Sequence, residues 1–317
     1  MAIEAPGPVD VEFLDLPALD GDEGAIGPFV AVAKRPWAGP VAVYSANADF
    51  GYSLAATVQR PAVFGTLLDP LPAGEPGRWM RGSVRVRIGS GSLQSREEMD
   101  VLAGANAAAL RAGGAGDWEV VQFRGAELVG PREYRLSDLL RGQAGTDGVM
   151  PDVWPAGTEF VSLDGLGARL PLAASARGLE RHYRVGPATR AYDDPSYLHR
   201  VEAFAGVALR PYRPAHLAAS RRSDGGIALS WVRRTRIDGD SWLGTEVPLG
   251  EEAESYLVRT FTAGGSPLRE VTTGASRFVY SLADQVRDGA TAALVFEVAQ
   301  VSVRFGAGPF ERIEFNG

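Results

Sequence analysis

The amino-acid sequence predicts a mainly β protein, in which a β-rich first part with one embedded helix is followed by a β-sandwich. Two observations predict this fold class. The 317 residues include 39 glycines and 21 prolines, which divide the chain into short segments, as turns between strands do. Several of these segments alternate in character: in Val84–Ile88, apolar side chains alternate with arginines, as in a half-buried strand.

The strands expected in the first part are short and bounded by turn residues. They are Val9–Leu16, Pro28–Arg35, Gly39–Ala46, Ser83–Ile88, Trp118–Val129, Thr158–Asp164, Arg169–Ser175 and Arg181–Thr189. Tyr134–Gly148 is expected to begin as a strand, to continue as a turn or short helix, and to end in a glycine-rich loop.

One helix is predicted, over Met99–Ala112. Ser95 is placed to cap it, and Glu97 and Glu98 suit the first turn because carboxylates favour a helix N-terminus. The segment itself consists mostly of helix-forming residues, and the glycines of Gly113–Gly116 stop it.

Prolines 211 and 214 mark the clearest change along the chain, which predicts domains over residues 1–206 and 207–317, with the first divided into 1–90 and 91–206 as an option. The last hundred residues resemble a fibronectin type III domain, with a proline-led first strand, Trp231 on the second strand and an alternating third strand, Ser255–Phe261. We expect Trp231 in the sandwich core, and the residues expected around it are Tyr256, Val258 and Val298.

The composition excludes several kinds of function. A net charge of −7 disfavours direct nucleic-acid binding. The absence of cysteine excludes disulfides, thiolate metal sites and a cysteine nucleophile within this chain. No apolar run approaches the ~18 residues of a membrane span, and the first residues lack the pattern of a signal peptide, so no stable membrane insertion is expected.

No catalytic, cofactor-binding or metal-binding residues are assigned, and the chain is predicted not to be an enzyme. Gly239–Trp242 resembles the nucleophile block of GDS-type lipases, but in that family a histidine follows the serine near the C-terminus. Here every histidine precedes Ser241. The histidines, His182, His199 and His216, lack the i, i+3 or i+4 spacing typical of a helical zinc site.

Charged residues after the second strand of the sandwich form the main candidate interface. They are Arg233, Arg234, Arg236, Asp238 and Asp240, with Trp242 beside them. Strand alternation divides the arginines between two faces, so they do not form one cationic stripe. Three alternatives stay open: pairing with the acidic run Glu246–Glu254, a contact with another subunit, or binding of a polyanion.

Two blocks resemble the tail-tip or host-specificity proteins of long-tailed phages, and in particular the baseplate hub protein of alphaproteobacterial gene transfer agents. In Trp118–Asp147 the resemblance lies in a Gln-Phe step, a Leu-Val-Gly turn and a L-x-x-LLRG-x-x-GT pattern from Leu136 to Thr146. The second block, Arg213–Trp242, is similar to the C-terminal module of the same proteins. Full-length members are longer, so the chain looks like the C-terminal part of such a protein.

The resemblance implies a β-rich tail-hub region followed by the sandwich, with a structural role in the tail of a virion-like particle. Such a component is assembled in the bacterial cytoplasm, leaves with the particle, and acts in hub assembly and in host-cell attachment or DNA delivery. The expected partners are other baseplate and tail proteins and two further copies of the chain in a homotrimer. Within the glycine-rich loop, Arg141 is either a contact between domains or subunits or a tie within its own loop.

Two other functions stay open at this point. The first is a glycan-binding adhesion module of the tail tip, which exposed Trp or Tyr side chains beside Asp or Arg would favour. The second is an accessory domain of a cell-wall-degrading hydrolase, which a pocket with paired carboxylates would favour.

Overall fold

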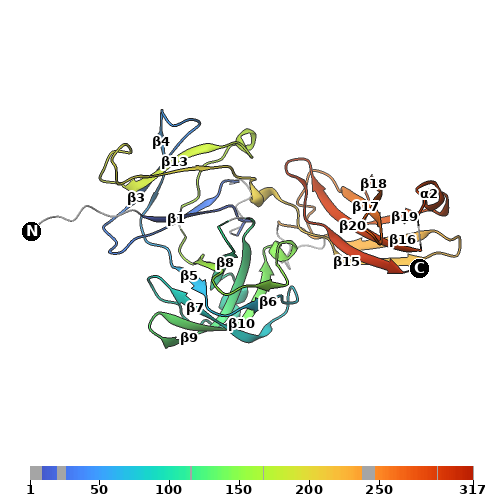
Figure 1. Ribbon diagram of the computed structural model, residues 1–317, viewed down its shortest axis with the longest axis horizontal. Coiled ribbons are helices and arrows are strands. Elements are labelled where there is room, and N and C mark those ends of the chain that lie inside the picture. The colour runs from blue at the N-terminus through green and yellow to red at the C-terminus, as the bar shows by residue number, and fades with distance from the viewer. Residues whose placement is uncertain are drawn as a thin grey trace, which may run out of the picture. The chain divides into compact units, whose positions relative to one another are not determined.

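The computed structural model describes residues 9–19, 26–114, 116–166, 168–237, 247–290 and 292–316 (Figure 1). The chain divides into two compact units, Met1–Ala208 and Leu209–Gly317, and each is described by itself below. Both units are built mainly from antiparallel strands, which confirms the predicted fold class. No helix of the described residues is long and apolar enough to span a membrane.

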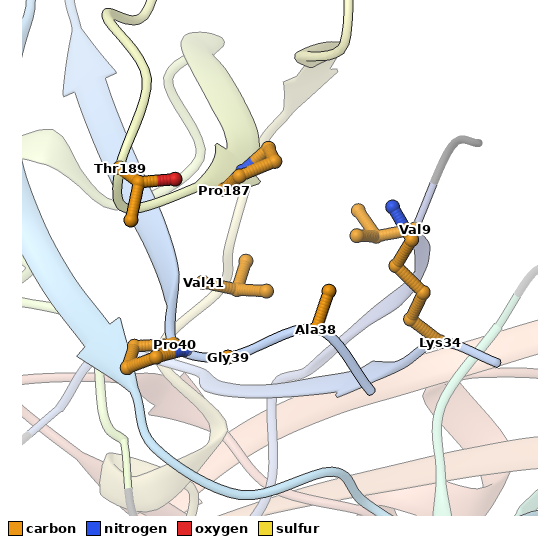
Figure 2. Close-up of a pocket in the computed structure, with 8 residues that line it drawn as sticks. All are labelled: Val9, Lys34, Ala38, Gly39, Pro40, Val41, Pro187 and Thr189. Carbon is orange, nitrogen blue, oxygen red and sulfur yellow. The ribbon is translucent and has the colours of Figure 1, made fainter. Parts of the chain in front are cut away.

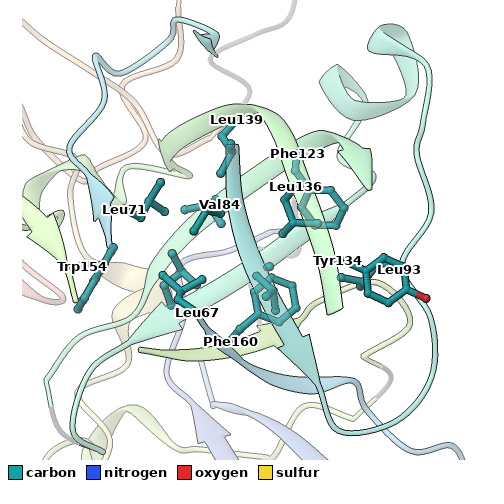
Figure 3. Close-up of a cluster of buried hydrophobic side chains, with 14 of the residues drawn as sticks. Leu67, Leu71, Val84, Leu93, Phe123, Tyr134, Leu136, Leu139, Trp154 and Phe160 are labelled. Carbon is teal, nitrogen blue, oxygen red and sulfur yellow. The ribbon is translucent and has the colours of Figure 1, made fainter. Parts of the chain in front are cut away.

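A closed barrel forms one layer of the first unit, with its strands in the order β10-β7-β5-β12-β8-β9. The strands are β5 (Phe64–Leu67), β7 (Met80–Ile88), β8 (Ala107–Arg111), β9 (Glu119–Gly130), β10 (Glu133–Gln143) and β12 (Glu159–Ser162). Apolar side chains from these strands meet inside the barrel, among them Val84, Phe123 and Phe160 (Figure 3). The alternation seen in the sequence of β7 therefore gives the barrel its inward-facing valines.

A four-stranded sheet, in the order β14-β13-β3-β4, forms another layer of this unit. Its strands are β3 (Val41–Ala46), β4 (Ser53–Val58), β13 (Arg181–Pro187) and β14 (Leu198–Glu202). The pair β1 (Asp10–Leu14) and β2 (Phe29–Ala33) lies between this sheet and the barrel (Figure 1). One face of the pair packs against the sheet through Phe13 and Val32, and the other packs against barrel strands through Leu14 and Ala31.

Shorter elements complete the first unit. They are β6 (Leu71–Pro72), which pairs with β11 (Val153–Trp154), the helix α1 (Glu98–Leu102), and the 3-10 turns η1 (Thr146–Gly148), η2 (Ala174–Ala176) and η3 (Val207–Leu209). The barrel takes β5 and β7 from before residue 90 and its other strands from after it. A division at residues 90 and 91 therefore does not follow the observed sheets.

The predicted helix over Met99–Ala112 is wrong beyond its first turn. Helix α1 ends at Leu102, Gly104 and Asn106 then take positive φ angles, and Ala107–Arg111 is strand β8. Strand β8 is buried on both faces, where only small or apolar side chains fit, so its alanines reflect packing rather than helix propensity. Nor does Ser95 cap α1: its hydroxyl accepts a hydrogen bond from the backbone N–H of Ala126.

The other predicted strands of this unit agree with the structure, with one exception. Arg169–Ser175 forms only a single bridge, between Phe29 and Arg169, before η2 begins. Pro171 has no N–H to donate to a ladder, which accounts for the missing strand. Tyr134–Gly148 is a strand followed by a 3-10 turn, as expected.

The second unit is a sandwich of two sheets with fibronectin type III-like strand order. One sheet has the order β15-β16-β19, and in the other β17 and β20 pair centrally, with β18 on one side and β22 on the other. The elements are β15 (Ala215–Arg221), β16 (Ile227–Val232), β17 (Tyr256–Thr262), β18 (Pro267–Thr273), β19 (Arg277–Tyr280), α2 (Leu282–Arg287), β20 (Ala293–Ser302), β21 (Gly306–Ala307) and β22 (Glu311–Asn316).

Trp231 lies in the core of the sandwich on β16, as predicted, and only 5% of it is exposed. Its ring meets that of Tyr256 edge to face, with the centroids 5.1 Å apart. Val258 and Val298 belong to the same buried cluster. The central residue of the fibronectin type III assignment is therefore where that fold requires it.

Candidate functional site

Arg141 has no exposed surface, and its partners lie within the first unit. Its guanidinium holds the buried carboxylate of Glu119 with two bonds, from Nε at 2.7 Å and from Nη2 at 2.8 Å. A third nitrogen donates to the carbonyl oxygen of Pro72. The side chain is therefore too buried to contact another subunit, and it does not tie down its own loop either: it joins β10 to Glu119 on β9 and to Pro72 on β6.

The carboxylate of Glu119 joins several parts of the barrel end. It accepts the backbone N–H of Gly142 at 2.9 Å and the indole N–H of Trp154, in addition to both bonds from Arg141. Gly142 has a φ of +61°, and a Cβ there would lie 2.7 Å from backbone and side-chain atoms of Asp147. The L-x-x-LLRG motif thus supplies a buried charged pair and a close backbone approach, both of which shape the barrel.

The arginines after β16 pair locally, mostly with the segment from residue 247 onward. Arg236 forms an ion pair with Glu251 at 3.0 Å, and both side chains are almost completely buried. Arg233 donates to the carbonyl oxygens of Val247 and Pro248. Arg234 lies over the ring of Tyr212 and donates to the carbonyl oxygen of Arg213. Of the three alternatives, pairing with the acidic run is seen for Arg236. Asp238, Asp240, Ser241 and Trp242 lie outside the described residues.

The hollows of the described residues do not form an enclosed substrate site. One, between the β2–β3 turn and the end of β13, has about 30 Å³ of space, enough for one or two water molecules (Figure 2). Val9 and Lys34 lie on one side of it, and Val41, Pro187 and Thr189 on the other. Two larger grooves, of about 670 Å³ beside β4 and about 400 Å³ along β17 and β18, are open to solvent.

The outer face of the four-stranded sheet brings together chemical groups that are distant in sequence. We call it the tyrosine patch, after its aromatic members Tyr44, Tyr52, Tyr192 and Tyr197. Ring centroids lie 5.5 Å apart for Tyr44 and Tyr192, and 5.3 Å for Tyr52 and Tyr192. The ring of Tyr197 covers Gly186, where a Cβ would lie 2.5 Å from ring carbons, so this position requires glycine.

A charged group lies beside these rings. Arg184, on β13, donates to Oδ1 of Asp49 at 2.8 Å, and the hydroxyl of Tyr52 donates to the same oxygen at 2.7 Å. The hydrogen bond from Arg184, assisted by that from Tyr52, lowers the pKa of the Asp49 carboxyl to about 2. This carboxylate is therefore ionised at any physiological pH.

Two histidines lie next to Asp49. His182 on β13 and His199 on β14 stack with their ring planes 11° apart, and Nδ1 of His182 is 3.0 Å from Nε2 of His199. Nε2 of His199 is 3.8 Å from Oδ1 of Asp49. The sequence spacing that excluded a helical zinc site does not apply here, because pairing of β13 with β14 brings together residues 17 positions apart.

Sequence reasoning did not find the tyrosine patch, since its members come from two distant stretches, residues 44–52 and 182–199, which meet through the pairing of β3 with β13. The available signal was weak: alternation in Arg181–Thr189 puts His182 and Arg184 on one face of the strand. Which segment lies opposite depends on the register, and that register is set by the buried face of the sheet.

Tyr197 gives a pH test of this patch. Burial, with smaller effects from Tyr44 and Asp194, raises its pKa to about 12. In the unfolded chain the phenol ionises near pH 10, so the stabilisation from protonated Tyr197 is complete below about pH 10 and is lost as the pH rises through about 12. Over this pH range the urea midpoint of the unchanged protein should fall, and that of Tyr197→Phe should fall less. Equal falls in the two proteins would show that Tyr197 does not cause this loss of stability.

Comparison with known proteins finds mostly similarities of low sequence identity. No curated protein matches the chain. Among solved structures, domains d3–d4 of rat CD45 are 15% identical, with 49% of this chain and 72% of that chain covered and a TM-score of 0.26. A two-domain fibronectin type III segment of chicken tenascin is 9% identical, covers 80% and 99%, and has a TM-score of 0.24. Titin domains A168–A170 are 13% identical, cover 98% and 99%, and have a TM-score of 0.24.

A family model gives a more local result. Its matched region begins just before β5 and ends within β12, so it coincides with the barrel. This region also contains the β9–β10 hairpin and the Arg141–Glu119 pair. Residues 62–161 of this chain match the family described as "Rcc01698-like, C-terminal".

Proposed function

We propose that this chain is a structural component of the baseplate or tail tip of a phage-like particle of the gene-transfer-agent type, acting through assembly rather than catalysis. The observation that carries the proposal is the coincidence of the barrel with both the family match and the tail-tip resemblance. The resemblance block Trp118–Asp147 forms the β9–β10 hairpin and most of η1. The most specific part of the tail-tip resemblance is therefore a structural part of one barrel.

The side chains of that block support a scaffold role because their contacts are internal. Leu136, Leu139 and Leu140 are buried. The hydroxyl of Thr146 accepts the N–H of Val120 at 2.9 Å and donates to the carbonyl oxygen of Gln143 at 2.7 Å. A motif used in this way specifies a shape, and it leaves contacts with other tail proteins to exposed side chains such as Leu128, which is 62% exposed.

The test is to locate the chain in purified particles. We expect antibody against it to label one end of the tail, and a density map of that end to contain three copies related by a threefold axis. Deleting its gene should stop production of particles that transfer DNA, and a plasmid copy should restore it. Particles that transfer DNA normally without the chain would overturn the proposal, and a single copy per tail would overturn the threefold arrangement.

A glycan-binding module is the second candidate, and the tyrosine patch favours it. Partly exposed aromatic rings next to an arginine and a carboxylate suit a sugar, whose apolar face packs on rings while its hydroxyls bond to charged groups. We expect Tyr52→Ala/Tyr192→Ala particles to assemble normally and, if this candidate holds, to adsorb to cells more weakly. Val279→Ala on the sandwich surface is a control. Unchanged adsorption by the double variant would remove this candidate and leave the structural role untouched.

A further inference from the structure

We propose that Asp49, His182 and His199 form a binding site for one divalent transition-metal ion, for which Zn²⁺ is the natural probe. One oxygen or nitrogen atom from each of the three residues lies within 4.8 Å of the other two. The proposal does not depend on the function proposed above, because it concerns only these side chains and the ion.

The distances are close to those of a metal-bound set. With Zn–N bonds of about 2.0–2.1 Å, tetrahedral coordination places two ligand nitrogens about 3.3 Å apart. Nδ1 of His182 and Nε2 of His199 are 3.0 Å apart, and the Asp49 oxygen is 3.8 Å from the latter. Changes of roughly 0.3 and 0.5 Å would bring these two separations to the tetrahedral value, and the remaining one, between His182 and Asp49, is at most 4.8 Å. Such changes are small for exposed side chains.

The donor set points to the kind of ion. Two imidazole nitrogens and one carboxylate suit Zn²⁺, Ni²⁺, Cu²⁺ or Fe²⁺, whereas Mg²⁺ and Ca²⁺ prefer sets made of oxygen. Three protein ligands leave further positions for water or a ligand oxygen. The side chains of His199 and Asp49 are 35% and 49% exposed, so an ion reaches them directly from solvent.

The surrounding structure holds the carboxylate in place. Arg184 and Tyr52 both donate to Oδ1, the oxygen that lies 3.8 Å from Nε2 of His199, and so fix the orientation of the carboxylate beside the histidines. Outer hydrogen bonds of this kind orient metal ligands. The positive charge of Arg184 repels a second cation nearby. This repulsion weakens the binding of hard cations, which are held by charge alone, more than that of ions that bind imidazole nitrogen strongly.

The competing arrangement is a hydrogen-bonded pair of neutral histidines, since a ring N–H of one could donate to the other at 3.0 Å. The two arrangements predict different results when a metal ion is added. A hydrogen-bonded histidine pair needs no ion, whereas the proposed metal site takes up one equivalent and uses all three residues.

The experiment is calorimetric titration of the tag-free, chelator-treated full chain with ZnCl₂. We expect saturable uptake of one equivalent, lost in His199→Ala and in His182→Ala, with folding of each variant checked by circular dichroism. His216→Ala is the matched control, because His216 is the chain's third histidine and lies on β15 in the other unit. It should bind one equivalent as before. Absence of saturable binding, or equal binding by His199→Ala, would overturn the proposal.

Discussion

Replacing Trp231 with alanine should lower the free energy of unfolding of the sandwich by about 3–5 kcal/mol, the usual cost of deleting a large buried aromatic ring. The ring is 5% exposed and lies against Tyr256, which is fully buried, so its removal leaves a cavity that rigid neighbours cannot fill. The Trp231 ring also meets the Tyr256 ring edge to face, and losing this contact lowers the free energy of unfolding further.

Hydrogen exchange of the full chain measures this effect locally. Backbone amides of β16, β17 and β20 should exchange faster in Trp231→Ala, while those of the barrel keep their protection. Val232→Ala is the matched control, since Val232 is the next residue, points to the opposite face and is 52% exposed. Similar, small changes in both variants would show that Trp231 does not organise this core.

Arg141→Met should destabilise the barrel by about 3–5 kcal/mol, because it leaves the Glu119 carboxylate buried without its countercharge. Both side chains are fully buried, so solvent cannot replace the two bonds that are lost. Glu119 would keep the N–H groups of Gly142 and Trp154, which offset only part of the charge.

Urea denaturation of matched variants tests this. Arg135→Met is the control: Arg135 lies on the same strand and pairs with Glu127 at 2.9 Å, but both side chains are largely exposed, so its loss should cost at most about 1 kcal/mol. Arg141→Met/Glu119→Gln should recover part of the stability, since a neutral amide is cheaper to bury and its oxygen still accepts. Equal losses for Arg141→Met and Arg135→Met would contradict the account.

Much of the fold could be predicted from local patterns. Alternation and turn residues located β7, β9 and the sandwich strands, and the aromatic on the second strand predicted the sandwich core. The prediction failed at β8, where alanines favour a helix locally but are needed as small side chains between two packed layers. Such a choice depends on neighbours that are distant in sequence.

The candidate sites were less predictable, for related reasons. Arg141 in a glycine-rich stretch suggested a surface contact, because nothing in the sequence marks Glu119 as its buried partner. His182, His199 and Asp49 meet only through the pairing of β13 with β14 and β3. By contrast, the pairing of Arg236 with the acidic run was within reach, because its partner Glu251 follows only 15 residues later.

The order of strands in the first unit has a consequence for how the chain folds during synthesis. Strands β3 and β4 are made before the barrel, yet β3 needs β13, which is made after it. The barrel is thus a nested insertion: its segment leaves the sheet after β4 and returns at β13, and β3 lies between these two strands. The barrel can close as soon as β12 has been synthesised, whereas the sheet is complete only after β13 and β14 have been made.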